Sequence, residues 1–230
     1  RLILLTLSAL AVVGAASADT AEPAMTVHGE GRIEVAPDMA TVRLGVLAEA
    51  PGAREAIDDN SRAMAGVIER LTQLGIEARD IQTANFSVQP RWHRSDGADA
   101  ATIAGFVARN LVVVRVREID RLGEVMDAVV RDGANTFEGV QFGLSDPRPA
   151  EADARRAAVA DARSKAELYA GAAGVELGPL MRLSEGGGAR PPMPIARAEM
   201  AMASDAVPVA PGELTVAASV VLVYEIVTPE

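Results

Sequence analysis

The spacing of apolar residues switches repeatedly along this chain between a period of two and a period near 3.6. The clearest helical segment covers residues 53–74, and Gly75 is well placed to end it. Its apolar residues share one face, with charged residues mostly opposite: Ile57, Met64, Val67, Ile68, Leu71 and Leu74. A chain that alternates between these two periods is constrained to build helices packed on a sheet.

The segment before this helix, residues 25–50, alternates with the period of two that is typical of strands. Ile33 is flanked by charged residues, and Val42 and Leu44 continue the alternation after the Ala-Pro-Asp sequence at 36–38. Proline and aspartate are turn residues, so the pattern predicts a β-hairpin with its turn at 36–38.

The rest of the chain continues the alternation of strands and helices. Strands are predicted at 80–92, 103–116, 136–146, 178–185 and 212–227, and helices at 119–131 and 147–173. The order ββαββαβαββ predicts an α+β fold with a mixed, mostly antiparallel sheet covered by the three helices on one face. The apolar run at 111–114 predicts a central strand. The sequence Ser145-Asp146-Pro147 is expected to supply an N-cap, followed by proline at the first position, for the alanine-rich third helix.

The first eighteen residues have the pattern of a secretory signal peptide. One arginine precedes an apolar run at 2–13, and Ala16-Ser17-Ala18 is a small-x-small cleavage sequence. The run is too short to span a bilayer, although a membrane anchor or a buried strand is the alternative. We therefore expect cleavage after Ala18, a single domain at 19–230 and no transmembrane segment after cleavage.

Composition excludes several classes of function. The chain has no cysteine, which excludes thiol catalysis, iron–sulfur clusters and zinc–thiolate sites. An exported chain without cysteine, long enough to build a core without disulfides, suits a bacterial periplasm. The net charge is −10, and −11 once Arg1 is removed with the leader. This acidity, without any dense basic cluster, argues against nucleic acid and anionic lipid as partners.

No motif in the chain predicts catalysis, a cofactor or a metal. His28 and His93 lack the short spacing of metal ligands, and no G-x-S-x-G sequence is present. Gly29 and Gly31 precede a strand rather than a helix, so they predict a bulge or a close backbone approach instead of a dinucleotide site. Asp and Glu are abundant but lie among arginines on helix faces, and a hydrolase with a carboxylate pair is the least favoured hypothesis.

The segment 186–212 is too long for an ordinary connection between strands. The sequence "SEGGGARPP" at 184–192 lacks the Lys-Ser/Thr of a phosphate loop, and its prolines forbid the helix that should follow. We expect a flexible Gly/Pro/Met loop, or a segment that contacts a neighbouring subunit. The alternative hypothesis is that Met193, Met200 and Met202 bind Cu(I) or a small ligand, since thioethers are copper ligands and are also oxidised reversibly.

The ordered set of segments resembles one bacterial family, the SIMPL-domain proteins, which include periplasmic immunogenic proteins. The resemblance lies in "VHGEGRIEVAPDMATVRLGV", "LGIEARDIQTANFSVQP", "GFVARNLVVVRV", "GVQFGLSDP", "ARSKAELYAGAAGVELG", "SEGGG" and "GELTVAASVVLVYE". It covers nearly all of the chain after residue 18. No single motif is diagnostic, but the order of the set is specific.

The resemblance implies a periplasmic or envelope-associated protein without an established enzymatic activity. It also implies a link to oxidative-stress tolerance and, for some relatives, assembly into large hollow oligomers. The family has no agreed catalytic residues, so none is assigned here. The resulting expectation is an exported, non-catalytic homo-oligomer without cofactor, associated with the envelope.

Overall fold

A computed structural model describes residues 23–93, 101–186, 193–195 and 210–228 of the protein. Residues 1–18 and most of the 186–212 segment lie outside these ranges, as do Met200 and Met202. The signal peptide, its cleavage site, the single-domain boundary and the flexibility of the long loop therefore stay predictions.

The elements follow one another in nearly the predicted order. They are β1 (Ala24–Val35), β2 (Met39–Ala50), α1 (Ala53–Gln73), η1 (Ala78–Asp80), β3 (Ile81–His93), β4 (Thr102–Val116), η2 (Ile119–Arg121), α2 (Leu122–Arg131), β5 (Thr136–Gly143), α3 (Arg148–Ala173), β6 (Glu176–Glu185), β7 (Met193–Ile195) and β8 (Glu213–Val227). The short strand β7, inside the expected loop, was not predicted, because three residues are too few to show a period.

The strands form two separate sheets, and this corrects the expectation of one sheet. One has the order β1-β8-β6, with β7 also paired to β8, and the other has the order β3-β4-β2-β5. Every pairing among the described strands is antiparallel. The α+β class is confirmed, and β4 is an internal strand as its apolar run predicted.

The expected hairpin of residues 25–50 is wrong, although both of its strands exist. Strand β1 pairs with β8, whereas β2 pairs with β4 and β5 in the other sheet. The alternating pattern sets which residues face a core, but it does not choose a partner strand. Residues 36–38 are therefore a connection between sheets and not a hairpin turn.

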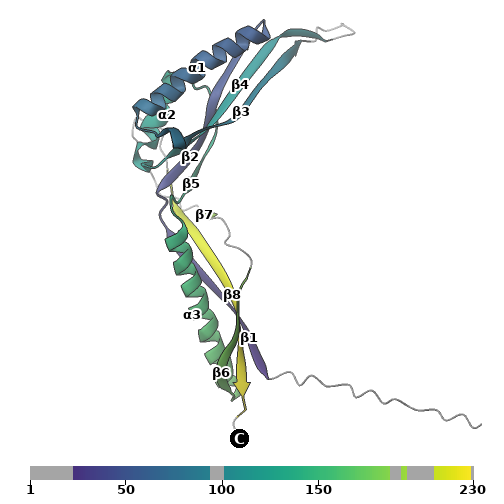
Figure 1. The fold of residues 1–230 in the computed structure, drawn as a ribbon, viewed down its shortest axis with the longest axis vertical. Helices are drawn as coiled ribbons and strands as arrows, with labels where there is room; N and C mark the ends of the chain where they lie inside the picture. The colour runs from purple at the N-terminus through teal and green to yellow at the C-terminus, as the bar shows by residue number, and fades with distance from the viewer. Residues whose placement is uncertain (1–22, 94–100, 187–192, 196–209, 229–230) are drawn as a thin grey trace, which may run out of the picture.

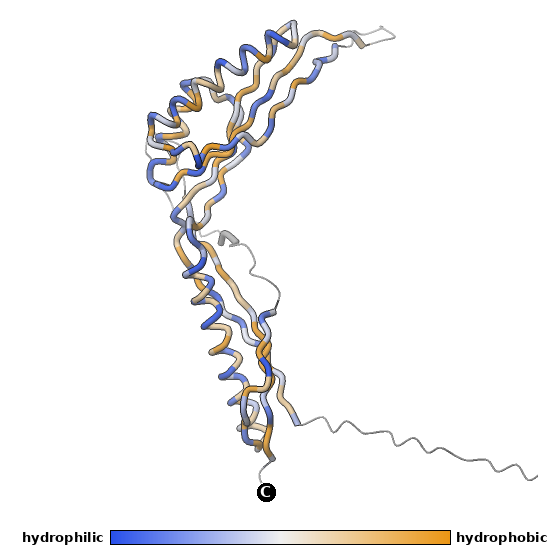
Figure 2. Tube along the Cα trace, viewed as in Figure 1, coloured by the Kyte–Doolittle hydropathy of each residue, from blue (hydrophilic) through white to orange (hydrophobic). Residues whose placement is uncertain are grey.

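Each sheet and its helices form one packed unit, and the two units lie end to end (Figure 1). The α3 unit contains β1, β6, β7, β8 and α3, and the α1–α2 unit contains β2 to β5, α1 and α2. Residues 39–143 form the whole of the α1–α2 unit, so this unit is inserted between β1 and α3. Hydrophobic residues run along the strands of both units, while the helices alternate between hydrophobic and hydrophilic positions (Figure 2).

The α1–α2 unit has a core of large aliphatic side chains between its helices and one face of its sheet. Alternate residues of β2 and β4 supply the sheet side of this core, as the period of two predicted. Its fully buried members include Val42, Leu44, Val112, Val114, Val67, Leu71, Leu122 and Val125.

The α3 unit packs almost without large side chains on its helix. A stripe of alanines at every fourth position faces the sheet, namely Ala154, Ala158, Ala162, Ala166 and Ala170. Gly29 and Gly31 of β1 lie under this stripe, where an added Cβ would fall 2.0 Å from the carbonyl oxygens of Ala158 and Ala154. The prediction that these two glycines and the alanine-rich helix serve a close approach is confirmed.

One carboxylate joins the two chain segments that cross between the units. Asp38 follows β1, and its carboxylate accepts hydrogen bonds from the backbone N–H and the hydroxyl of Ser145, both at 2.6 Å. The backbone N–H of Asp38 also donates to the carbonyl of Gly143 at 3.2 Å. The sequence 145–147 was predicted to supply the N-cap of α3 and then proline at its first position, but Pro147 is itself the N-cap and the helix begins at Arg148. The carboxylate of Asp146 accepts a hydrogen bond from the backbone N–H of Arg148 at 3.1 Å.

Candidate functional site

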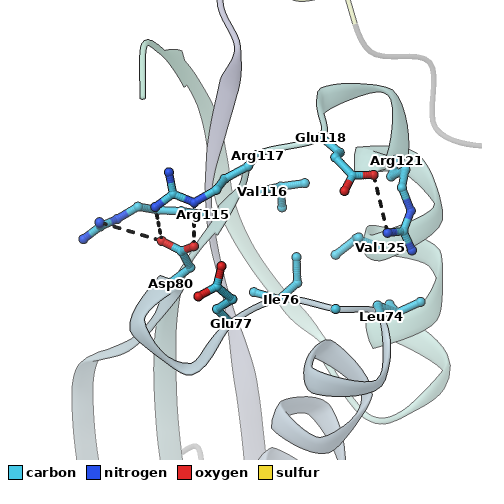
Figure 3. Close-up of a pocket in the computed structure, with 11 residues that line it drawn as sticks. Leu74, Ile76, Glu77, Asp80, Arg115, Val116, Arg117, Glu118, Arg121 and Val125 are labelled. Atoms are coloured by element: carbon cyan, nitrogen blue, oxygen red, sulfur yellow. Dashed lines mark hydrogen bonds and ion pairs between the residues drawn. The ribbon is translucent and has the colours of Figure 1, made fainter. Parts of the chain in front are cut away.

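A cavity of about 120 Å³ lies between the end of α1 and the end of β4 (Figure 3). Its lining comes from the loop after α1, the end of β4 and the start of α2: Leu74, Gly75, Ile76, Glu77, Asp80, Arg115, Val116, Arg117, Glu118, Arg121 and Val125. Pockets for drug-sized ligands occupy about 300–1,000 Å³, so this cavity is too small for a nucleotide or a similar cofactor.

Asp80 is the one buried carboxylate in the described part of the chain, and it lies at this cavity. Its side chain is 3% exposed and accepts two hydrogen bonds from Arg117, both at 2.8 Å. Arg115 approaches the same carboxylate to 3.9 Å. The hydrogen bonds from Arg117 lower the pKa of Asp80 below its ordinary value and outweigh the effect of burial, which acts in the opposite direction.

This geometry indicates a structural role for Asp80. A general acid near neutral pH needs a raised pKa, and the pKa of Asp80 is lowered. Both carboxylate oxygens already accept hydrogen bonds from Arg117. The pair joins the short η1 turn to the end of β4, and therefore fixes the entry of the chain into β3.

The other residues considered from the sequence do not come together. His28 lies exposed on β1 and His93 lies exposed at the end of β3, in different sheets. Within the described ranges, no three His, Asp or Glu side chains gather closely enough to hold a metal ion. Met193 is placed in β7 by its backbone, but its side chain, Met200 and Met202 lie outside what the structure describes. The copper hypothesis is therefore not tested.

Strand edges are the second kind of candidate site, because an unpaired edge can pair with another chain. In the α3 unit, the outer edge of β1 is occupied by side chains of α3. Asp161 accepts a hydrogen bond from the backbone N–H of Glu30 at 2.8 Å, and Lys165 donates to the carbonyl of His28 at 3.1 Å. Asp161 and Lys165 also bond to each other at 2.7 Å, so together they cap the middle of this edge.

The opposite edge of the same sheet, strand β6, has no strand beside it in the described part of the chain. Helix α3 packs chiefly on β1 and β8 and leaves most of β6 uncovered. Leu180, Met181 and Leu183 of β6 are 46%, 47% and 52% exposed. We call these three residues the β6 edge.

Sequence reasoning missed the Asp80 pair, the capped β1 edge and the β6 edge. Asp161 and Lys165 were visible as an i,i+4 pair on a helix, but such pairs usually face solvent. Which strand is an edge depends on pairing between residues far apart in the chain, and that is not visible in a local pattern. Pro179 in β6 was the available signal, because proline in a strand indicates an edge.

The comparison with known protein families covers both units. Residues 25–224 match the family described as "SIMPL: Protein of unknown function (DUF541)". The chain belongs to the SIMPL family. The sequence resemblance is therefore confirmed over both units.

The names of similar proteins say little about function. The chain is 38% identical over 216 residues to the "26 kDa periplasmic immunogenic protein" of Brucella melitensis, covering 90% of this chain and 86% of the relative. It is 32% identical over 187 residues to the "Uncharacterized protein YggE" of Edwardsiella ictaluri, covering 78% and 77%. The protein of the same name from Escherichia coli K12 is 28% identical over 191 residues, covering 83% and 76%. None of these names describes an enzyme.

No helix in the described ranges is both long enough and apolar enough to cross a membrane.

Proposed function

We propose that this SIMPL protein is an exported, non-catalytic protein of the periplasm that self-associates through the β6 edge. The observation that carries the proposal is the asymmetry of one sheet: the edge at β1 is capped by Asp161 and Lys165, and the edge at β6 is open. An open edge with apolar side chains is a template for strand addition.

Export to the periplasm is supported by two independent features. One is the leader at 1–18 with its small residues before position 19. The other is the name of the Brucella relative, which places that protein in the periplasm. Cleavage after Ala18 is tested by the intact mass of the exported protein, and a retained leader would contradict it.

The absence of catalysis in this proposal is supported by the ion pair of the buried carboxylate of Asp80. The cavity at Asp80 is small, and its carboxylate is held by arginine. A contribution to oxidative-stress tolerance belongs to the proposal through the family resemblance alone. It is tested by comparing the survival of cells with and without the gene after exposure to peroxide.

Self-association is tested by measuring the native mass of the protein across a range of concentrations, by light scattering after size exclusion. The informative variant is Leu183→Lys, because lysine on an edge strand disfavours strand addition. Its matched control is Leu168→Lys on α3, where the leucine is 66% exposed and lies away from β6.

We expect the wild type to exceed the monomer mass at micromolar concentration. Leu183→Lys should raise the concentration at half-assembly at least tenfold, and Leu168→Lys should leave it unchanged. A monomeric wild type, or equal assembly of both variants, would overturn the proposal.

A further inference from the structure

The two units touch each other very little. Among the described elements, no helix or strand of the α3 unit makes an extensive contact with a helix or strand of the α1–α2 unit. Two short chain segments cross between the units, residues 36–38 from β1 to β2 and residues 144–147 from β5 to α3. The angle between the units (Figure 1) is therefore set at these two crossings and not by a packed interface.

Prolines restrict much of the backbone at both crossings. Pro37 and Pro147 have fixed φ angles, and the residue before each proline is also restricted. The least restricted rotations are those of Asp38 and of residues 144–145. Hinges consist of a few residues of this kind, which absorb the changes in φ and ψ when two rigid bodies turn.

Hydrogen bonds join the two crossings at these same residues. The carboxylate of Asp38 accepts from the backbone N–H and from the hydroxyl of Ser145, both at 2.6 Å, and the backbone N–H of Asp38 donates to the carbonyl of Gly143 at 3.2 Å. Asp38 and Ser145 are both exposed, so water competes for their polar groups and the bonds contribute only a modest free energy. A contact of this kind can open without unfolding either core.

We propose that Asp38 and Ser145 form a clasp that fixes the angle between the two units, and that the chain hinges at residues 38 and 144–145 when the clasp opens. Opening leaves both sheets and their helices intact and changes only the direction in which the α1–α2 unit points from the α3 unit. The clasp lies within a single chain, so this proposal does not depend on self-association.

Distances between spin labels on the two units measure the hinge directly. The chain has no cysteine, so Ala65→Cys on α1 and Ala160→Cys on α3 give two unique labelling sites, both at exposed helical positions. Pulsed electron paramagnetic resonance then gives the distribution of distances between the labels. Mixing the labelled protein with an excess of unlabelled protein removes contributions from neighbouring copies.

Three variants are compared in this labelled background. Asp38→Ala removes both bonds between its side chain and Ser145, and Ser145→Ala removes the bond from the hydroxyl alone. The matched control is Asp146→Ala, because Asp146 lies in the same crossing as Ser145 but its carboxylate bonds to Arg148 of α3. Thermal melting checks that all variants fold.

We expect one narrow distance distribution for the wild type and a distribution at least twice as broad for Asp38→Ala. Ser145→Ala should have an intermediate width, and Asp146→Ala should keep the wild-type width. Where Asp38→Ala melts earlier than the wild type, the milder Ser145→Ala decides, and a width equal to that of the wild type then counts against the clasp. Equal widths for the wild type and Asp38→Ala, or equal broadening by Asp146→Ala, would overturn the proposal.

Discussion

Both units lay helices on one face of an antiparallel sheet, but the distance between the layers is set by different residues. In the α1–α2 unit, leucine, valine and methionine side chains separate the helices from the sheet. In the α3 unit, alanines meet glycines, and the backbone of α3 nearly touches that of β1. The α1–α2 unit is stabilised by the aliphatic area that it buries. Close packing in the α3 unit depends on the absence of large side chains between α3 and β1.

The largest expected effect comes from adding a side chain in the α3 unit. Gly29→Val places a Cβ 2.0 Å from the carbonyl oxygen of Ala158, and that oxygen belongs to the backbone of a helix. Overpacking usually costs about 1–3 kcal/mol, and here we expect more than about 4 kcal/mol because the main chain has to move. Denaturant unfolding measures the loss, and hydrogen exchange should locate it in β1 and α3.

The control for this variant lies in the same unit. An added Cβ at Gly171 of α3 meets no atom within 4 Å. Gly171→Ala should therefore stabilise the helix by about 0.5–1 kcal/mol. Equal stability of Gly29→Val and the wild type would show that α3 does not lie this close to β1.

The next largest effect concerns the α1–α2 unit, where removing side-chain atoms from the core lowers stability. Leu44 is fully buried, and Leu44→Ala should lower the free energy of unfolding by about 2–5 kcal/mol, because it leaves a cavity. Hydrogen exchange should increase in residues 39–143 and much less in the α3 unit. Equal loss of protection in both units would show that the two cores unfold together and are not separate.

The smallest expected effect is electrostatic and also belongs to the α1–α2 unit. The pKa of Asp80 is lowered in the folded protein, so its stabilisation is present above the ordinary value of 3.8 and is lost as pH falls below it. Asp80→Asn should cost about 1–2 kcal/mol at pH 7, a modest value because Arg117 and Arg115 are 42% and 44% exposed.

The measurement for Asp80 is the free energy of unfolding as a function of pH. Between pH 5 and pH 2 the wild type should lose more stability than Asp80→Asn, and the two curves should converge at the acid end. The matched control is Asp58→Asn, which removes an exposed carboxylate from α1. Parallel curves for wild type and Asp80→Asn would show that the Arg117 pair does not stabilise the fold.

The comparison of units also shows what the sequence can predict. The alanines of α3 predicted a close approach to a sheet, and Gly29 and Gly31 predicted either a bulge or a close approach, because only small residues allow two backbones to come so near. The partner of β1 was not predictable, because β8 lies about 180 residues away and any alternating strand fits the same pattern. The β6 edge was missed for the same reason: Leu183 becomes informative only when the neighbouring strands are known.

The nested order of the two units has a consequence for synthesis. Strand β1 is synthesised before residues 39–143, yet the strand that pairs with it, β8, is synthesised after them. Residues 39–143 are synthesised before β8 and can fold while both edges of β1 are still unpaired. The amino-terminal segment is thus the part of the newborn polypeptide most in need of protection by a chaperone, and a stalled chain lacking β8 would expose it permanently.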